Sequence, residues 1–241
     1  MADAQLNYIA RIHTDLPLKF GVPRQSGLVK ALSGEIVFEP PYRSAEAVRD
    51  LEKFTHLWLI WQFSMAMRDT WSPTVRPPRL GGNRRVGVFA TRSPFRPNFL
   101  GLSAVRLEGV SLGGDKGPVL RVSGVDLADG TPIFDIKPYI PYADCLPEAG
   151  GGFTDVVPRP LLRVEADEAL LSRIPGDKRE ALLGVLENDP RPAYQDSPDR
   201  VYGFPFAGYE VRFAVSDGVL TVVDISEGKT KADCQPIKNN G

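Results

Sequence analysis

The sequence predicts a mainly β protein in which a larger N-terminal part is followed by a small α+β domain. The 241 residues include 22 prolines and 23 glycines, more than a helical bundle tolerates, which favours short strands and many turns. Before residue 140, several segments rich in β-branched or aromatic residues are bounded by turn residues. We expect strands at residues 6–13, 35–38, 56–63, 85–91, 102–110, 119–126 and 133–137.

One short helix is expected in the N-terminal part, at residues 45–51, with Ser44 as its N-cap. After three glycines at 150–152, which have the composition of a hinge, the apolar spacing becomes helical. The elements expected there are helices at 167–174 and 177–186, the second capped by Asp177, and a hairpin of strands at 206–215 and 219–225.

These patterns divide the chain into two domains and a tail. We expect a β domain at 5–147, a small α+β domain at 153–226 and a disordered polar tail at 227–241. No apolar run approaches the roughly 20 residues that cross a bilayer, and the first residues lack the pattern of a secretory signal. We therefore expect a cytoplasmic protein that does not bind a membrane.

The charge is unevenly distributed along the chain. Residues 1–69 contain eight basic and eight acidic residues, whereas residues 70–107, called here the arginine segment, contain seven arginines and no acid. Because the whole chain carries −1, the remaining residues carry −1 − 7 = −8. A cationic segment of this kind favours a phosphate-bearing or other anionic ligand. The alternative is that these arginines brace loops by bonding to carbonyl oxygens and to acids elsewhere in the fold.

Several classes of enzyme are disfavoured. The sequence has neither the phosphate-binding loop of P-loop enzymes nor a glycine-rich dinucleotide motif, and its first part lacks strand–helix alternation. The two histidines, His13 and His56, and the two cysteines, Cys145 and Cys234, have no zinc-binding spacing. No metal is expected.

Three segments combine polar side chains with prolines, which fix backbone angles and lower the entropy lost when a polar site is held in place. The first is GVPRQSG at 21–27. The second is PPRLGGN at 77–83, followed by GVFATRSPFRPNFLGLS at 87–103. The third is DLADGTP at 126–132, followed by DIKPYIPY at 135–142. They favour a rigid polar pocket; the alternative is that they are irregular connections in a barrel.

The second and third segments resemble the TsaA-like (YaeB/TrmO) family of S-adenosylmethionine-dependent tRNA adenosine N6-methyltransferases. The family pattern TRSPFRPNPIGLS matches residues 91–103, and its patterns DLxDGTP and DIKPYxPY match 126–132 and 135–142. The likeness extends from residue 5 to about 145 and resumes at 189–194. It implies a single-sheeted β-barrel methyltransferase, commonly a homodimer. The implied substrate is the threonylcarbamoylated adenosine 3′ of the anticodon in threonine tRNAs.

Two positions depart from the family. Phe99 and Leu100 replace its Pro-Ile, a packing change expected to leave Arg96 and Asn98 usable. Ser64 stands where many relatives have histidine, which excludes a catalytic histidine there.

The resemblance also implies the cofactor pocket. Arginine suits the carboxylate of S-adenosylmethionine, aspartate suits its ribose hydroxyls, and apolar or aromatic side chains suit its adenine. The implied cofactor-binding residues are Pro23, Arg24, Gln25, Phe63, Ser64, Met65, Arg92, Leu102, Val125, Asp126 and Leu127.

A smaller set is expected to act on the base. We hypothesise that Asp135, with Asn98, holds the N–H groups of the adenosine amine, which makes its nitrogen a better nucleophile. Tyr139 would stack on the extruded base, and Lys137 would neutralise a phosphate or the threonyl carboxylate. The alternative for Asp135 is a structural acid that pairs with an arginine of the arginine segment.

Phosphate contacts are expected from the remaining arginines, which would position the tRNA without reading its sequence. The candidates are Arg76, Arg79, Arg84, Arg85 and Arg96. Two other functions stay open. One is a non-catalytic module that binds S-adenosylmethionine or RNA, and the other is a methyltransferase for a different anionic substrate.

Overall fold

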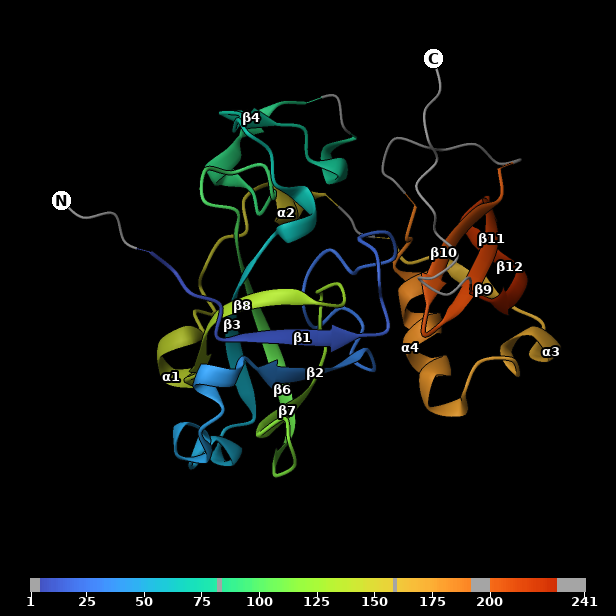
Figure 1. Ribbon diagram of the computed structural model, residues 1–241. Helices are drawn as coiled ribbons and strands as arrows, with labels where there is room; N and C mark the ends of the chain where they lie inside the picture. The colour runs from blue at the N-terminus through green and yellow to red at the C-terminus, as the bar shows by residue number, and fades with distance from the viewer. Residues whose placement is uncertain (1–4, 82–83, 158–159, 192–199, 229–241) are drawn as a thin grey trace, which may run out of the picture.

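A closed six-stranded barrel forms the larger part of the protein (Figure 1). The computed structural model describes residues 5–81, 84–157, 160–191 and 200–228. The strands follow the order β1-β2-β7-β6-β3-β8 around the barrel, and each contact between neighbours is antiparallel. The strands are β1 (Ala10–Thr14), β2 (Ser33–Phe38), β3 (His56–Gln62), β6 (Leu100–Leu112), β7 (Pro118–Ser123) and β8 (Thr131–Pro138). The mainly β expectation and the single-sheeted barrel are confirmed.

Burial alternates along the strands of the barrel. In β3 the buried residues Leu57, Leu59 and Trp61 alternate with half-buried neighbours. Because successive strand side chains point to opposite faces, one face of β3 lines the barrel core and the other faces outward. Ile12 and Ile36 enter the same core from β1 and β2 and are fully buried.

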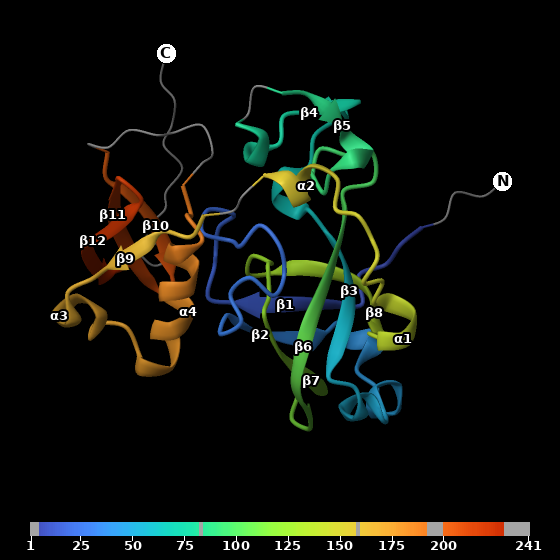
Figure 2. The same ribbon diagram turned by 180° about the vertical axis from the view of Figure 1, so that it is seen from behind.

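Residues 64–99, which connect β3 to β6, form an excursion beyond one end of the barrel (Figures 1 and 2). Its only ladder among the described residues is a two-residue ribbon in which Thr74 pairs with Gly87 and Val75 with Val86. The excursion contains seven arginines and one acid, Asp69, so its net charge is +6. Its elements are η4 (Ser64–Ala66), β4 (Thr74–Val75), η5 (Pro78–Leu80), β5 (Val86–Gly87) and η6 (Val88–Ala90).

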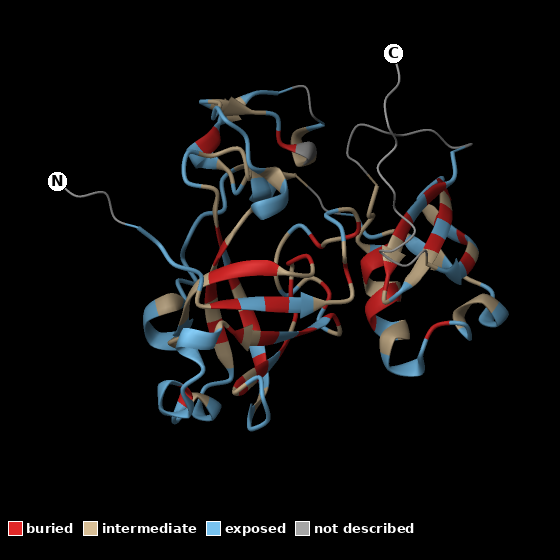
Figure 3. Ribbon diagram, viewed as in Figure 1, coloured by how far each residue is buried: buried red, intermediate tan, exposed pale blue. Residues whose placement is uncertain are grey.

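A second sheet with two helices lies beside the barrel (Figure 1). Its strand order is β10-β11-β12-β9, and β9 runs parallel to β12. Helix α4 buries Leu182 and Leu186 on one face, in the same core cluster as the strand residues (Figure 3). The elements are β9 (Arg163–Glu165), α3 (Glu168–Leu171), α4 (Gly176–Glu187), β10 (Tyr202–Phe206), β11 (Tyr209–Ser216) and β12 (Val219–Glu227).

The two parts meet along the segment that connects β1 to β2. The backbone N–H of Ala207 donates to the carbonyl oxygen of Asp15 at 2.8 Å. The Asp15 carboxylate also pairs with Lys178 at 2.7 Å, and both side chains are largely buried. Phe20 packs against Phe204, with ring centroids 6.1 Å apart. This contact is therefore both polar and apolar.

Two expected elements of the barrel part were wrong. The strand expected at 85–91 shrinks to two residues, because the Thr91 hydroxyl bonds to the Val88 carbonyl oxygen at 2.8 Å and the chain turns in η6. The helix expected at 45–51 is interrupted at Asp50, whose φ is 66°. Ser44 makes no side-chain cap bond. Five short helical segments complete this part of the chain. Three precede β3 and two follow β8: η1 (Pro40–Tyr42), η2 (Ala45–Val48), η3 (Leu51–Lys53), α1 (Pro141–Asp144) and α2 (Phe153–Val156).

Corrections also apply to the second part of the chain. Asp177 does not cap α4, because the helix begins one residue earlier, after Pro175. The strand expected at 206–215 begins only at Tyr209, since Ala207 and Gly208 both adopt positive φ and turn the chain. Strands β9 and β10 were not expected. Glu227, the first residue of the expected tail, ends β12, and residues 229–241 lie outside the described residues. The domain boundaries stay predictions.

Substitution of Gly21 tests the contact between the barrel and the second sheet. Gly21 has φ +90°, and a Cβ there would lie 2.6 Å from Cδ2 of Phe204. Gly21→Ala should cost about 1–2 kcal/mol for the left-handed backbone and about 1–3 kcal/mol more for overpacking. Urea denaturation measures both. Gly208→Ala is the matched control, because φ is +85° and nothing lies within 4 Å of its Cβ. Equal losses in the two variants would contradict the packing argument.

Candidate active site

Asp126 lies in the loop that joins β7 to β8 and is largely buried. Burial raises the pKa of this carboxyl to about 6. The Ser103 hydroxyl, the backbone N–H groups of Asp126 and Ser26, and the Arg92 charge lower it in part. Its Oδ1 atom is buried and has no hydrogen-bond partner among the described residues. An unpartnered buried acceptor is costly, so this atom is suited to a ligand that donates a hydrogen bond.

Two other predicted cofactor residues meet beside this carboxyl. The Arg92 guanidinium donates to Oε1 of Gln25 at 2.5 Å, and its charge acts on Asp126. Gln25 in turn donates to the Arg24 carbonyl oxygen. Segments more than 60 residues apart in the sequence therefore place a guanidinium, an amide and a carboxylate in one polar cluster. A guanidinium of this kind can bind a carboxylate, and the Asp126 carboxylate can accept from hydroxyl or amino groups.

Aromatic side chains line the adjacent end of the barrel. The Phe63 ring packs edge-on against Trp61 with centroids 4.3 Å apart, and the Trp61 N–H donates to the Ser103 hydroxyl at 2.9 Å. Gly101 makes this possible, because a Cβ there would lie 2.3 Å from the Trp61 ring. The Ser103 hydroxyl near Asp126 is thus held in place by the barrel core.

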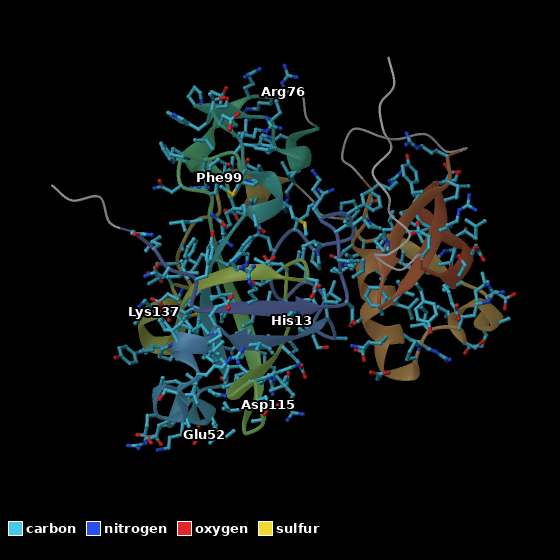
Figure 4. All side chains as sticks on the ribbon, viewed as in Figure 1. His13, Glu52, Arg76, Phe99, Asp115 and Lys137 are labelled. Carbon is cyan, nitrogen blue, oxygen red and sulfur yellow. The ribbon has the colours of Figure 1, made fainter. Side chains whose placement is uncertain are left out.

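The loop at 91–99 is tied to this end of the barrel through Phe99. The Phe63 N–H donates to the Phe99 carbonyl oxygen at 2.9 Å, and Phe99 lies between the barrel and the excursion (Figure 4). Phe99 has φ 47°, a conformation that the proline of the family pattern cannot adopt. The substitution therefore changes the backbone as well as the packing.

Asp135 and Leu102 lie in one row on the outer face of the barrel. Ile60 pairs with Leu102 on β6 and with Asp135 on β8, so the three side chains share a face. A β-bulge in the β3–β8 ladder immediately follows this row, and bulges often re-aim side chains near active sites. Leu102 is 53% exposed. The fold therefore brings one predicted cofactor residue and one predicted catalytic residue to the same surface.

Lys137 and Tyr139 extend this surface. Lys137 Nζ pairs with Oδ2 of Asp135 at 2.8 Å, and Lys137 lies on the side of the barrel (Figure 4). The Tyr139 ring packs against Trp58 with centroids 5.5 Å apart. The partner of Asp135 is thus a lysine of the predicted catalytic set rather than an arginine of the arginine segment. Oδ1 of Asp135 also accepts a hydrogen bond from the Ile136 N–H at 2.9 Å.

Other predicted site residues are placed differently from this cluster. Val125 and Leu127 are buried in the apolar core, so only their backbone can reach a ligand. Asn98 is exposed and makes no hydrogen bond with any described residue. The structure records no contact that joins it to Asp135. Among the rest, Pro23 is buried, whereas Arg24, Ser64 and Met65 are exposed.

The arginines predicted to bind phosphate have different surroundings. Arg79 donates to the carbonyl oxygens of Thr154 and Val157 at 2.6–3.1 Å, and Arg96 donates to the Thr91 carbonyl at 3.0 Å. Both brace loops, as the alternative interpretation proposed. Arg85 donates to the Thr74 hydroxyl. Arg76 stands at the far end of the excursion (Figure 4), and Arg84 is exposed.

A cavity of about 440 Å³ lies further along the outer face of β3 and β6. It continues the row of outward residues beyond Leu102, and Glu180 of α4 lines its other side. Sequence reasoning missed it, because its lining comes from five separated segments and has no motif. It is lined by Gly27, Lys30, Ala31, His56, Ala104, Arg106, Glu108, Ser123, Gly124 and Glu180.

Comparison with known proteins identifies the family. The sequence profile of the tRNA-methyltransferase O N-terminal domain matches residues 11–145, and that of the TrmO C-terminal domain matches residues 161–228. The chain belongs to the TrmO family. The resemblance drawn from the motifs at 91–103 and 126–142 is thereby confirmed.

Similar proteins extend over nearly the whole chain. The tRNA (adenine(37)-N6)-methyltransferase of Escherichia coli (strain K12) is 43% identical over 233 residues, which cover 92% of this chain and 97% of that protein. A putative S-adenosylmethionine-dependent methyltransferase of Pseudomonas aeruginosa, RcsF, is 42% identical and covers 87% of this chain and 92% of its own. The crystal structure of TrmO from Pseudomonas aeruginosa has a TM-score of 0.73 at 32% identity, covering 93% of this chain and 100% of that chain.

The buried carboxyl makes a prediction about stability. Because the pKa of Asp126 is about 6 when folded and its ordinary value is 3.8, the folded state binds more protons between these values. Stability should therefore fall as the pH rises from about 4 to 6. Asp126→Asn should remove this loss, raising the free energy of unfolding by about 3 kcal/mol above pH 6 and hardly at all near pH 4.

Denaturant titrations across this pH range measure the effect. Asp115→Asn is the control, because Asp115 is exposed in the turn between β6 and β7 (Figure 4). A gap between wild type and Asp126→Asn that does not change with pH would contradict the assignment of the raised pKa.

Proposed function

We propose that this enzyme transfers a methyl group from S-adenosylmethionine to N6 of adenosine 37 in tRNA. We propose further that the substrate is the threonylcarbamoylated adenosine of threonine tRNAs. Membership of the TrmO family across both parts of the chain supports the activity. The single structural observation that carries the cofactor assignment is the unpartnered Oδ1 of Asp126 beside the Arg92–Gln25 pair.

The donors and acceptors of this cluster fit the functional groups of the cofactor. Asp126 would accept from ribose hydroxyls, Arg92 would bind the carboxylate, and Phe63 and Leu102 would contact the adenine. The backbone at Val125 and Leu127 would complete the wall. When bound, S-adenosylmethionine supplies a methyl group on a positively charged sulfur, which reacts by in-line displacement.

The chain's own residues would mainly position the reactants. Asp135 would accept the N–H of the adenosine amine, which holds the nitrogen lone pair toward the cofactor side of the outer face. Lys137, paired with Asp135 at 2.8 Å, would bind the threonyl carboxylate or a phosphate. Tyr139, which packs against Trp58, would stack on the base. Because the Asp135 side chain is already oriented by Lys137 and the Ile136 N–H, little reorganisation is needed.

The assembly and location of the enzyme are also proposals. A homodimer would cover the open side of the site, where Leu102 and Met65 are 53% and 44% exposed. A cytoplasmic location agrees with a tRNA substrate. Among the described residues, no helix is long and apolar enough to span a bilayer, and no cluster of three metal-binding side chains is present.

The activity is tested by transfer of radioactive methyl groups to threonine tRNA from a strain that lacks the enzyme. We expect incorporation into this tRNA and at least about 100-fold less into the same tRNA without the threonylcarbamoyl group, because the carboxylate contact of Lys137 would be lost. Binding without transfer would favour the alternative of a non-catalytic module. Equal transfer to both tRNAs would contradict the proposed substrate.

Asp135→Asn tests the catalytic assignment. An amide accepts a hydrogen bond from the amine less strongly than a carboxylate, so kcat should fall by about 100-fold or more while the Kd for S-adenosylmethionine changes by less than about twofold. Single-turnover kinetics and calorimetry measure the two quantities. Lys137→Met breaks the same ion pair but keeps the carboxylate, and it should raise KM for tRNA more than it lowers kcat. Equal losses of turnover and cofactor affinity in Asp135→Asn would refute the role.

A further inference from the structure

Two aromatic side chains of the excursion form an exposed stack. The rings of Trp71 and Phe89 lie 28° from parallel with centroids 6.2 Å apart. They are 49% and 72% exposed, and neither belongs to the hydrophobic core cluster. Large aromatic rings left in water next to one another indicate a binding surface rather than a folding requirement.

The local backbone fixes this stack without help from the core. Trp71 precedes β4 and Phe89 follows β5, so the ribbon brings the two rings to the same end. The Val88 N–H donates to the Pro73 carbonyl oxygen at 3.0 Å, and the Val88 side chain is buried beneath. The aromatic surface is thus preorganised, which lowers the entropy cost of binding.

The surroundings of the stack are cationic. The excursion carries +6, and extension of the β4–β5 register places Arg76 opposite Arg85 at the other end of the ribbon. At a rise of about 3.3 Å per strand residue, the basic end and the aromatic end lie within reach of one stretch of nucleic acid. Stacking surfaces beside basic side chains are how proteins bind single-stranded RNA, since every base presents a π face.

We propose that Trp71 and Phe89 form a stacking platform for an unpaired base of the tRNA anticodon loop, separate from the site that holds the modified adenosine. This inference rests on the proposed function, because it takes tRNA as the substrate. The platform contributes affinity without reading sequence, and Arg84 with Arg85 contacts the adjoining phosphates. It also accounts for an aromatic pair that the catalytic site does not use.

A second copy of this chain is the competing occupant, since the residues outside the excursion carry −7, the difference between −1 and +6. RNA is favoured because the two rings and six of the seven arginines lie in residues 71–96, a short segment in which no acidic residue occurs. A protein interface would need a wider apolar area than two rings supply. The two occupants give different results in the experiment.

The experiment measures the affinity of the full-length protein for the anticodon stem-loop of threonine tRNA by fluorescence anisotropy. The double variant Trp71→Leu/Phe89→Leu keeps apolar bulk but removes both π faces. We expect binding about 5- to 150-fold weaker, the range measured for loss of one stacked base. The slope of log affinity against log salt should stay unchanged, because the phosphate contacts remain. Leu112→Ala is the control: it removes another exposed apolar side chain, at the opposite end of the barrel, and should bind as wild type does.

Single abasic substitutions in the loop identify the stacked base. At one position the wild type should lose affinity to the same extent, while the double variant loses nothing further. Trp71→Phe keeps a ring and should retain most of the affinity, which separates stacking from a folding defect. Unchanged affinity in the double variant, or an equal response of both proteins to every abasic site, would overturn the proposal.

Methyl transfer at saturating stem-loop separates this inference from the proposed function. If the wild type methylates tRNA and the double variant binds it equally well, the platform is refuted and the enzyme function stands. If the wild type neither binds nor methylates tRNA, the function itself fails. If sedimentation shows that the double variant dissociates a dimer while its RNA affinity is unchanged, the surface is an interface between copies and the proposal falls.

Discussion

Closure of the six-stranded sheet around β3 is the constraint on which the site depends. Because β3 pairs with β6 on one edge and β8 on the other, its two faces have different roles. The inward face supplies Leu57, Leu59 and Trp61 to the core, and the outward face aligns Asp135 with Leu102 through Ile60. Closure also leaves no free edges in this sheet. The positions of Asp135 and Leu102 are therefore fixed by the same ladders that stabilise the barrel.

Burial of the Asp126 carboxyl at the end of the barrel lowers the stability of the fold. Asp126 is held among buried neighbours, with Oδ1 unpartnered among the described residues and a pKa raised to about 6. A carboxylate kept in such surroundings disfavours folding at neutral pH, since its charged form is poorly solvated. The same poor solvation makes it a stronger acceptor for a ligand hydroxyl than an exposed aspartate would be. In the proposed cofactor site, stability and ligand binding therefore make opposite demands on Asp126.

The sequence patterns identified the segments that contain the proposed site residues. They did not predict how the fold brings these segments together. Residues 91–103 and 126–142 could be recognised because their prolines, glycines and charged residues form long, specific patterns. The barrel order could not be derived, since β2 pairs with β7 and β3 with β8 across long sequence separations. Val125 and Leu127 were expected to line the pocket, yet a motif does not reveal that a loop turns these side chains inward. The positive φ of Phe99 depends on its neighbours in space and leaves no pattern in the sequence.

An arginine of the excursion can brace a loop and still attract an anionic ligand. Arg79 and Arg96 bond to carbonyl oxygens, Arg85 bonds to a hydroxyl, and Arg92 bonds to an amide oxygen. Each of these partners is neutral, so the bonds fix the loop without neutralising the guanidinium. Arg92 differs from the other three in that its charge also acts on the Asp126 carboxyl. Long-range attraction depends on net charge rather than on free donors. An arginine that holds a loop thus still contributes to the field that draws in a polyanion. The aromatic pair of the excursion lies within that field, which suits it to the proposed stacking role.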